Sequence, residues 1–185
     1  MAKNFFRDGI LLFIYILLSA FSAGHLREKV QRIYTSQIGV KERTGHNDGT
    51  SVKKYLGVCH LCEGYQWCSA FVSWVYDSAG VKTQHTAWAP AWYNEKQVIY
   101  KQGWKHPKTT PQPGDLVLYY NPYQKRISHV GFFDKYGTQY CETVEGNTGV
   151  GNDQGVHRIK RYWLSFFAII NKQDDFINLN KYQIR

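Results

Sequence analysis

The sequence predicts an α+β domain with N-terminal helices packed on a C-terminal antiparallel β-sheet. Two observations predict this class. Apolar residues recur at helical spacing between residues 26 and 79, whereas short apolar runs bounded by turn residues fill the stretch from Pro111 to Asn171. Helices followed by strands is the order of an α+β fold, and it differs from the alternating order of a parallel α/β fold.

The first residues have the features of an export signal. Lys3 and Arg7 precede an apolar run from Gly9 to Phe21, and small residues follow this run. The run is well short of the roughly 20 residues that a membrane-spanning helix needs. We therefore expect residues 1–24 to be a signal peptide that is removed on export and leaves no stable membrane span, with an uncleaved anchor as the alternative. Residues 25–185 should then form one domain that is periplasmic or secreted.

The charge of the chain limits its partners. The formal net charge is +9 at pH 7, but the basic residues occur singly or in pairs, such as Lys53–Lys54 and Lys160–Arg161. This spacing is typical of a solvated surface and disfavours the continuous basic stripe of a nucleic-acid-binding protein. A diffuse positive field favours an anionic polymer such as a cell envelope. We expect a monomer without a nucleic-acid partner.

Four segments are predicted to be helical: residues 26–38, a short stretch that begins at Thr50 or Ser51, residues 68–79, and part of residues 88–100. The third segment has the clearest pattern, because its apolar residues recur at i, i+3, i+4 and i+8 from Phe71. Gly80 suits the left-handed position just past a helix end. The short helix should bury its three apolar side chains, Val52, Tyr55 and Leu56.

The second half of the chain predicts strands. A turn at Pro111–Asp115 leads into a strand at Leu116–Tyr120, and two later strands, residues 129–134 and 139–145, flank a turn that we centre on Gly137. In that hairpin, residue 129 lies opposite residue 145. A slip of one residue would place the two side chains on opposite faces of the sheet.

Cys68 is a candidate nucleophile. It is predicted to begin the third helix, and the unpaired N–H groups at a helix N-terminus favour the thiolate, which is the reactive form of cysteine. The alternative is an inert thiol in the core. A nucleophilic role requires a base from elsewhere in the chain.

His129 is the candidate base, because it opens a predicted strand and a strand end is rigid. A lone strand histidine is more often structural, so a catalytic role needs a further partner. Glu145 is placed opposite by the predicted hairpin, where its carboxylate could orient the imidazole and stabilise the imidazolium. Asp115 and Asp134 are better explained as turn or strand-end residues.

Four short motifs resemble the CHAP amidohydrolase/peptidase domains, which are relatives of NlpC-type peptidases and papain-like enzymes. The segment Gly64–Trp74 looks like the nucleophile motif, and Ser128–Gly131 looks like the histidine motif. Pro113–Val117 is similar to the segment that begins the first strand, and Val144–Thr148 is similar to the acidic motif. The four motifs occur in the family's order, and the resemblance covers most of the chain after residue 24.

The resemblance implies a papain-like fold and cleavage of amide bonds in peptidoglycan, either as an N-acetylmuramoyl-L-alanine amidase or as a peptide endopeptidase. It implies that Cys68 attacks, His129 acts as base and Glu145 orients the imidazole. Asn147 is a secondary site candidate. Backbone N–H groups near Cys68, assisted by Gln66, would stabilise the oxyanion, although Gln66 could instead pack at the turn.

No metal or cofactor is expected. Some family members carry an acidic calcium loop before the cysteine, but Cys59–Gly64 lacks the alternating Asp ligands of such a loop. A single Cys-x-x-Cys pair, even with His60 and Cys141, is a poor zinc signal. Export permits a disulfide among Cys59, Cys62 and Cys141, and a packed core thiol is an equal alternative for Cys141.

Two other functions fit the same sequence. One is an interbacterial or phage-type lytic toxin with the same chemistry, which the export signal disfavours. The other is a non-catalytic wall-binding domain that has kept the fold. The presence of Cys68, His129 and Glu145 together favours the hydrolase over that domain.

Overall fold

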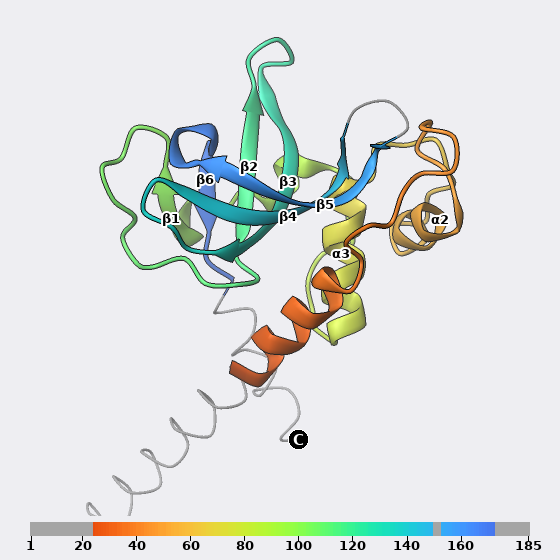
Figure 1. The fold of residues 1–185 in the computed structure, drawn as a ribbon, viewed down its shortest axis with the longest axis horizontal. Helices are drawn as coiled ribbons and strands as arrows, with labels where there is room; N and C mark the ends of the chain where they lie inside the picture. Colours follow the sequence, from red (N-terminus) through yellow and green to blue (C-terminus); the bar gives the residue numbers. More distant parts are fainter. Residues whose placement is uncertain (1–23, 150–152, 173–185) are drawn as a thin grey trace, which may run out of the picture.

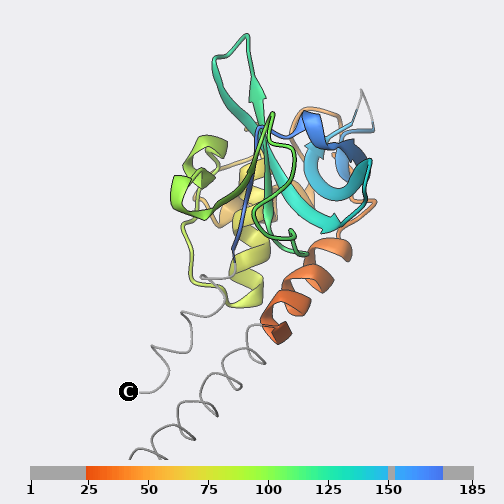
Figure 2. The ribbon, with the colours of Figure 1, turned by 90° about the vertical axis from the view of Figure 1, so that its left-hand side faces the viewer.

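The computed structural model describes residues 24–149 and 153–172, so the predicted export signal, except its last residue, lies outside the described residues. Three helices lie beside a six-stranded antiparallel sheet, which confirms the predicted class (Figures 1 and 2). The strands are β1 (Val98–Lys101), β2 (Leu116–Asn121), β3 (Arg126–Lys135), β4 (Tyr140–Thr148), β5 (Gly155–Tyr162) and β6 (Ala168–Ile170), in the spatial order β1-β6-β2-β3-β4-β5.

The predicted helices form in three of the four segments. The described part of the N-terminal helix covers residues 24–35, α2 covers Thr50–Gly57 and α3 covers Cys68–Ala79. Helix α2 buries the three side chains expected of it. Gly80 ends α3 in the left-handed conformation, with φ at 82°, as the sequence predicts.

The helix predicted within residues 88–100 is wrong. The chain forms two short 3₁₀ turns there, η1 (Ala89–Trp92) and η2 (Glu95–Gln97), before β1 begins. Pro90 stands at the start of η1, and Asn94 accepts a hydrogen bond from the Lys96 N–H that opens a new turn. Both residues favour turn starts over helix interiors, so the aromatic spacing does not become a long helix.

Two aspartates attach the N-terminal helix to the sheet. Asp115 accepts a hydrogen bond from Arg27 at 3.0 Å, and Asp134 accepts one from the hydroxyl of Tyr34 at 2.7 Å. Both carboxylates are buried. This agrees with the expectation that Asp115 and Asp134 have structural roles.

The sheet separates two apolar clusters. The larger cluster joins the helices to one face of the sheet, where the Phe132 ring stacks on Tyr34 and meets Phe71 and Tyr76 edge-on. The smaller cluster lies on the other face and includes Phe133 and Cys141. The sheet is therefore buried on both sides near its centre, which gives the site a rigid base.

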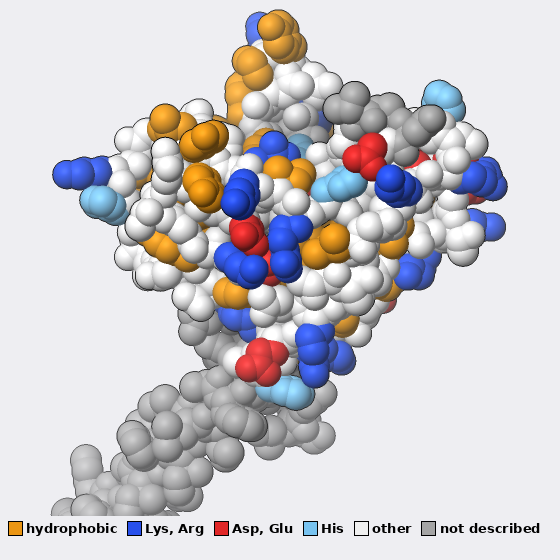
Figure 3. Space-filling view, viewed as in Figure 1, with side chains coloured by type: hydrophobic (Ala, Val, Ile, Leu, Met, Phe, Trp, Pro, Cys, Tyr) orange, Lys and Arg blue, Asp and Glu red, His pale blue; other side chains and the backbone are white. Residues whose placement is uncertain are grey.

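Positive side chains on the outer surface are interleaved with carboxylates. Figure 3 shows Lys and Arg side chains next to Asp and Glu side chains over one face of the molecule. Lys135 pairs with Glu142 at 3.1 Å, and Lys41 pairs with Asp153 at 2.8 Å. Among the residues that the structure describes, no helix is long and apolar enough to cross a membrane.

Candidate active site

Cys68 is the first residue of α3 and is 4% exposed. The loop before it is held in place by Trp67, whose indole Nε1 donates to Glu42 at 2.8 Å. The backbone N–H of Trp67 donates to the side-chain oxygen of Asn147 at 3.2 Å. These contacts fix the start of the helix, so the thiol has a defined position against the sheet.

His129 lies in β3 and meets Cys68 through a side-chain hydrogen bond. Its Nε2 lies 2.8 Å from Oε2 of Glu145. Because Nε2 faces the carboxylate, Nδ1 is the nitrogen left for the thiol. The three residues selected from the sequence therefore form one continuous chain of hydrogen bonds.

Glu145 is fully buried, and both of its carboxylate oxygens accept hydrogen bonds. Oε1 accepts hydrogen bonds from the hydroxyls of Tyr119 and Thr143, each at 2.6 Å. Arg161 binds both oxygens, with Nε 3.0 Å from Oε1 and Nη2 2.7 Å from Oε2. A bidentate guanidinium fixes a carboxylate in plane and direction, so Glu145 presents Oε2 to His129 in a set orientation.

The predicted register of the β3–β4 hairpin is wrong by two residues. Phe132 pairs with Val144, so the register continues to Gly131 opposite Glu145. The displacement comes from the turn, because Lys135 pairs with Glu142 and the turn is therefore centred after Gly137. The bulge between Phe133 and Lys135 reduces the displacement by one residue. Since side chains alternate with a period of two, a displacement of two residues keeps Glu145 on the face of His129.

Gly131 makes the diagonal contact sterically feasible. A Cβ added at Gly131 would lie 2.5 Å from Cγ of Glu145 and 3.1 Å from the Val144 carbonyl oxygen. The glycine leaves the space through which the Glu145 side chain passes on its way to His129.

The charges around the pair favour the thiolate and the imidazolium. Burial alone would raise the pKa of Cys68, but the charge and hydrogen bond of His129 and the N–H groups of Val130 and Ser69 lower this pKa below its ordinary value. Burial alone would lower the pKa of His129, and Cys68 and Glu145 together raise it. The hydrogen bonds of His129 and Arg161 outweigh burial and hold the pKa of Glu145 well below its usual range, so its carboxylate stays ionised.

Of the two secondary site candidates, Gln66 lines the cavity at Cys68, and Asn147 belongs to a separate hydrogen-bond network. Asn147 does not contact His129 in the described hydrogen-bond network; its side chain instead joins Trp67, Glu42 and Asn47. Gln66 is exposed and lines a cavity of about 470 Å³ together with Cys68. Trp88 and Arg126 line the same cavity, so the thiol opens on a groove that these residues share.

Sequence reasoning missed three contacts of the carboxylate: Tyr119, Thr143 and Arg161. Arg161 was interpreted as part of a solvated pair with Lys160, and this is wrong because its guanidinium binds a buried carboxylate. Thr143 could have been found, since it lies two residues before Glu145 and therefore shares its face. No local signal indicated Arg161 or Tyr119.

Residues 61–147 match the family model of the CHAP domain. This segment of the chain is similar to CHAP domains. The matched segment includes Cys68, His129 and Glu145, whereas Arg161 follows it. No curated protein sequence matches the chain.

The papain-like fold of this chain is similar to the folds of solved structures. The P60 domain of an antigen from M. avium paratuberculosis is 17% identical, with a TM-score of 0.50 over 83% of this chain and 98% of that one. RipA, a resuscitation promoting factor interacting protein, is 18% identical, with a TM-score of 0.49 over 82% of this chain and 64% of that one. RipB from Mycobacterium tuberculosis, a peptidoglycan hydrolase, is also 18% identical, with a TM-score of 0.47 over 81% and 66%.

The other cysteines, Cys59, Cys62 and Cys141, are free thiols. Cys141 is buried in the smaller apolar cluster, in agreement with a packed core thiol, whereas Cys62 is exposed. Within residues 24–149 and 153–172, no three His, Cys, Asp or Glu side chains gather in a way that could hold a metal ion.

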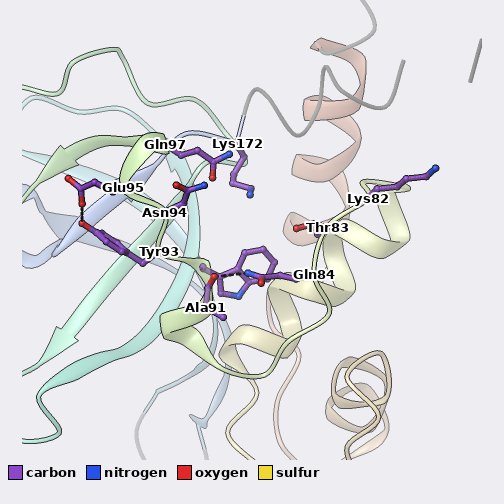
Figure 4. A pocket seen from close by; sticks show the side chains of 10 residues that line it. Lys82, Thr83, Gln84, Ala91, Tyr93, Asn94, Glu95, Gln97 and Lys172 are labelled. Carbon is purple, nitrogen blue, oxygen red and sulfur yellow. Dashed lines mark hydrogen bonds between the residues drawn. The ribbon is translucent and has the colours of Figure 1, made fainter. Parts of the chain in front are cut away.

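A second cavity, of about 650 Å³, shares no lining residue with the groove at Cys68. In Figure 4, Tyr93 donates a hydrogen bond to Glu95 on one side of it, and Gln84 donates to the Ala91 carbonyl at 2.8 Å. A hydrogen bond links the linings of the two cavities. Trp92 lines the second cavity, and its indole N–H donates at 2.8 Å to the hydroxyl of Ser69, which follows Cys68 in the chain.

Proposed function

We propose that this chain is an exported cysteine hydrolase that cleaves amide bonds in bacterial peptidoglycan with Cys68, His129 and Glu145 as its catalytic triad. The observation that carries the proposal is the hydrogen-bonded sequence from Cys68 through His129 to Glu145, which opens on the groove described above. A thiol, an imidazole and an orienting carboxylate in this order are the parts of a nucleophilic amide hydrolase.

The reaction has two steps. In the first, the Cys68 thiolate attacks the carbonyl carbon of the scissile amide, and His129 gives its proton to the leaving nitrogen as the C–N bond breaks. This leaves a thioester on Cys68 and a neutral imidazole. In the second step, His129 takes a proton from water, the hydroxide attacks the thioester, and the carboxylic acid product leaves as the thiolate and imidazolium are restored.

Two groups support the transition states in this proposal. The backbone N–H of Ser69 at the start of α3 donates to the Cys68 sulfur. In this proposal it would also donate to the negative oxygen of the tetrahedral intermediate, which forms beside that sulfur. Gln66, which lines the same groove, would add a side-chain donor. Glu145 orients the imidazole, and Arg161 holds Glu145 as a positioning residue.

The substrate assignment rests on the match to the CHAP domain model and on the resemblance of the four motifs. The proposal covers both the amidase and the endopeptidase reaction, since both break an amide next to the same kind of carbonyl. Export to the periplasm or the cell exterior rests on the residues of the N-terminal signal and would bring the enzyme to the wall.

The test compares the wild type with Cys68→Ala and with Cys62→Ala as a matched control that removes an exposed thiol outside the triad. Purified sacculi are incubated with each protein, and the released fragments are identified by mass spectrometry, which also tells which amide is cut. We expect Cys68→Ala to lose on the order of a thousandfold or more in rate while keeping its circular dichroism spectrum. Equal release by Cys68→Ala and the wild type would refute the mechanism.

A further inference from the structure

The groove at Cys68 contains one guanidinium, that of Arg126. This residue lines the groove with Trp88, Gln124 and Ser128, on the same cavity as the thiol. No Asp or Glu is among the described residues that line it. A ligand group in this part of the groove therefore meets a positive charge without a competing carboxylate.

The guanidinium of Arg126 is held by two contacts, neither of which is with a carboxylate. Its Cζ lies 4.5 Å from the ring centroid of Trp88, and its Nη1 donates to the Ile127 carbonyl at 3.1 Å. No carboxylate among the described residues lies within salt-bridge distance of it. A guanidinium has five N–H donors, so several donors are left for a ligand. Stacking on an indole fixes the plane of the fork and lowers the entropy lost when it binds a carboxylate in bidentate fashion.

The exposure of Trp88 agrees with a contact surface. Its side chain is 53% exposed, although it is a large aromatic residue in a groove. An indole that stacks on Arg126 on one side and remains open to the groove can also cover the apolar part of a bound peptide.

The strand fixes the distance from this subsite to the chemistry. Arg126 begins β3, three residues before His129. At about 3.3 Å per residue, the two Cα atoms lie at most roughly 10 Å apart, and the bulge between Ile127 and His129 shortens this distance. A peptide in an extended conformation covers this distance in about three residues. A carboxylate within about three residues of the scissile amide is therefore in range of the subsite.

We infer that Arg126, stacked on Trp88, binds a carboxylate of the substrate peptide, so that the site prefers stem peptides with free carboxylates to those with carboxamides. The inference rests on the proposed function, since it assigns a substrate contact to the same site. The ligand class is an anionic peptide. Charge-assisted bidentate contacts of this kind are among the strongest that a side chain can make.

The experiment uses two soluble muropeptides that differ only in having free or amidated carboxyl groups. We expect the wild type to cleave the free form with a kcat/KM about tenfold or more above that of the amidated form. Arg126→Ala should remove this preference, mainly through a higher KM for the free form, and leave the amidated form unchanged. Arg126→Lys should restore part of the preference. Lys125→Gln removes a neighbouring exposed charge outside the groove and should behave as the wild type.

A parallel measurement separates this inference from the proposed function. Binding of both muropeptides to Cys68→Ala, and to the same protein with Arg126→Ala, is measured by calorimetry. If the wild type cleaves neither muropeptide but Cys68→Ala binds the free form more tightly through Arg126, the proposed function fails and the carboxylate subsite stands. Equal affinity for the two forms, including no binding of either, overturns the subsite. So does an equal loss of cleavage of both forms in Arg126→Ala.

Discussion

The carboxylate of Glu145 reaches the imidazole of His129 diagonally, past Gly131, with 2.8 Å between Oε2 and Nε2. The same carboxylate is bound on both oxygens by Arg161. The buried carboxylate of Glu145 thus binds both His129 and Arg161. The contact with Arg161 fixes the orientation in which the carboxylate meets His129.

Cys68 should be alkylated faster than Cys62 at pH 6, although Cys62 is exposed and Cys68 is 4% exposed. The reason is that alkylation requires the thiolate, and the pKa of Cys68 is lowered by its contacts with His129. Iodoacetamide labelling followed by peptide mass spectrometry gives the rate at each site. Labelling of Cys62 alone at this pH would contradict the assignment. Cys141 is a buried control whose pKa is raised to about 11 by burial, and it should stay unlabelled.

The activity should follow a bell-shaped pH profile with a plateau across neutrality. Below the lowered pKa of Cys68 the thiol is protonated and cannot attack, and above the raised pKa of His129 the imidazole is neutral and cannot protonate the leaving nitrogen. In Glu145→Gln the imidazolium loses its carboxylate, so the alkaline limb should move to lower pH and kcat should fall on the order of 100-fold. The profile of kcat/KM measures both limbs. An unmoved alkaline limb would argue against contact between Glu145 and the imidazolium.

Arg161→Met should lower kcat about tenfold with little change in KM, because Glu145 keeps its charge but loses the group that fixes its direction. Removal of one partner from a buried pair should also cost about 3 kcal/mol in the free energy of unfolding. Arg161→Lys should recover only part of the activity, since an ammonium cannot bind two oxygens in one plane. Lys160→Met removes a charge from the adjacent exposed position and should leave kcat unchanged. Equal effects of the two methionine variants would indicate a general effect of charge.

Gly131→Ala should lose most of its activity under conditions in which the protein is still folded. The added methyl group would lie 2.5 Å from Cγ of Glu145, so the side chain must move away from His129. We expect about 1–3 kcal/mol of destabilisation from overpacking. Gly57→Ala is the matched control, because nothing lies within 4 Å of its added Cβ. Kinetics and thermal unfolding of both variants separate an effect on the active site from a general loss of stability. Full activity in Gly131→Ala would show that the path of the Glu145 side chain past Gly131 is not required.

The sequence by itself determined the order of helices and strands, the helix that Cys68 begins, and the shared face of His129 and Glu145. It could do so because helical spacing and strand alternation are local patterns, and a two-residue error in register leaves the face of a side chain unchanged. The helix predicted within residues 88–100 failed where Pro90 and Asn94 favoured turns over a regular aromatic spacing.

Only the tertiary structure decided which groups surround the carboxylate. Arg161 and Tyr119 come from β5 and β2, two different strands of the sheet, and their approach to Glu145 depends on the register of each strand and on side-chain rotamers. The same holds for the pairing of Arg126 with Trp88 across the groove. Contacts between segments far apart in sequence are set by the packing of the whole sheet, which no local pattern of residues encodes.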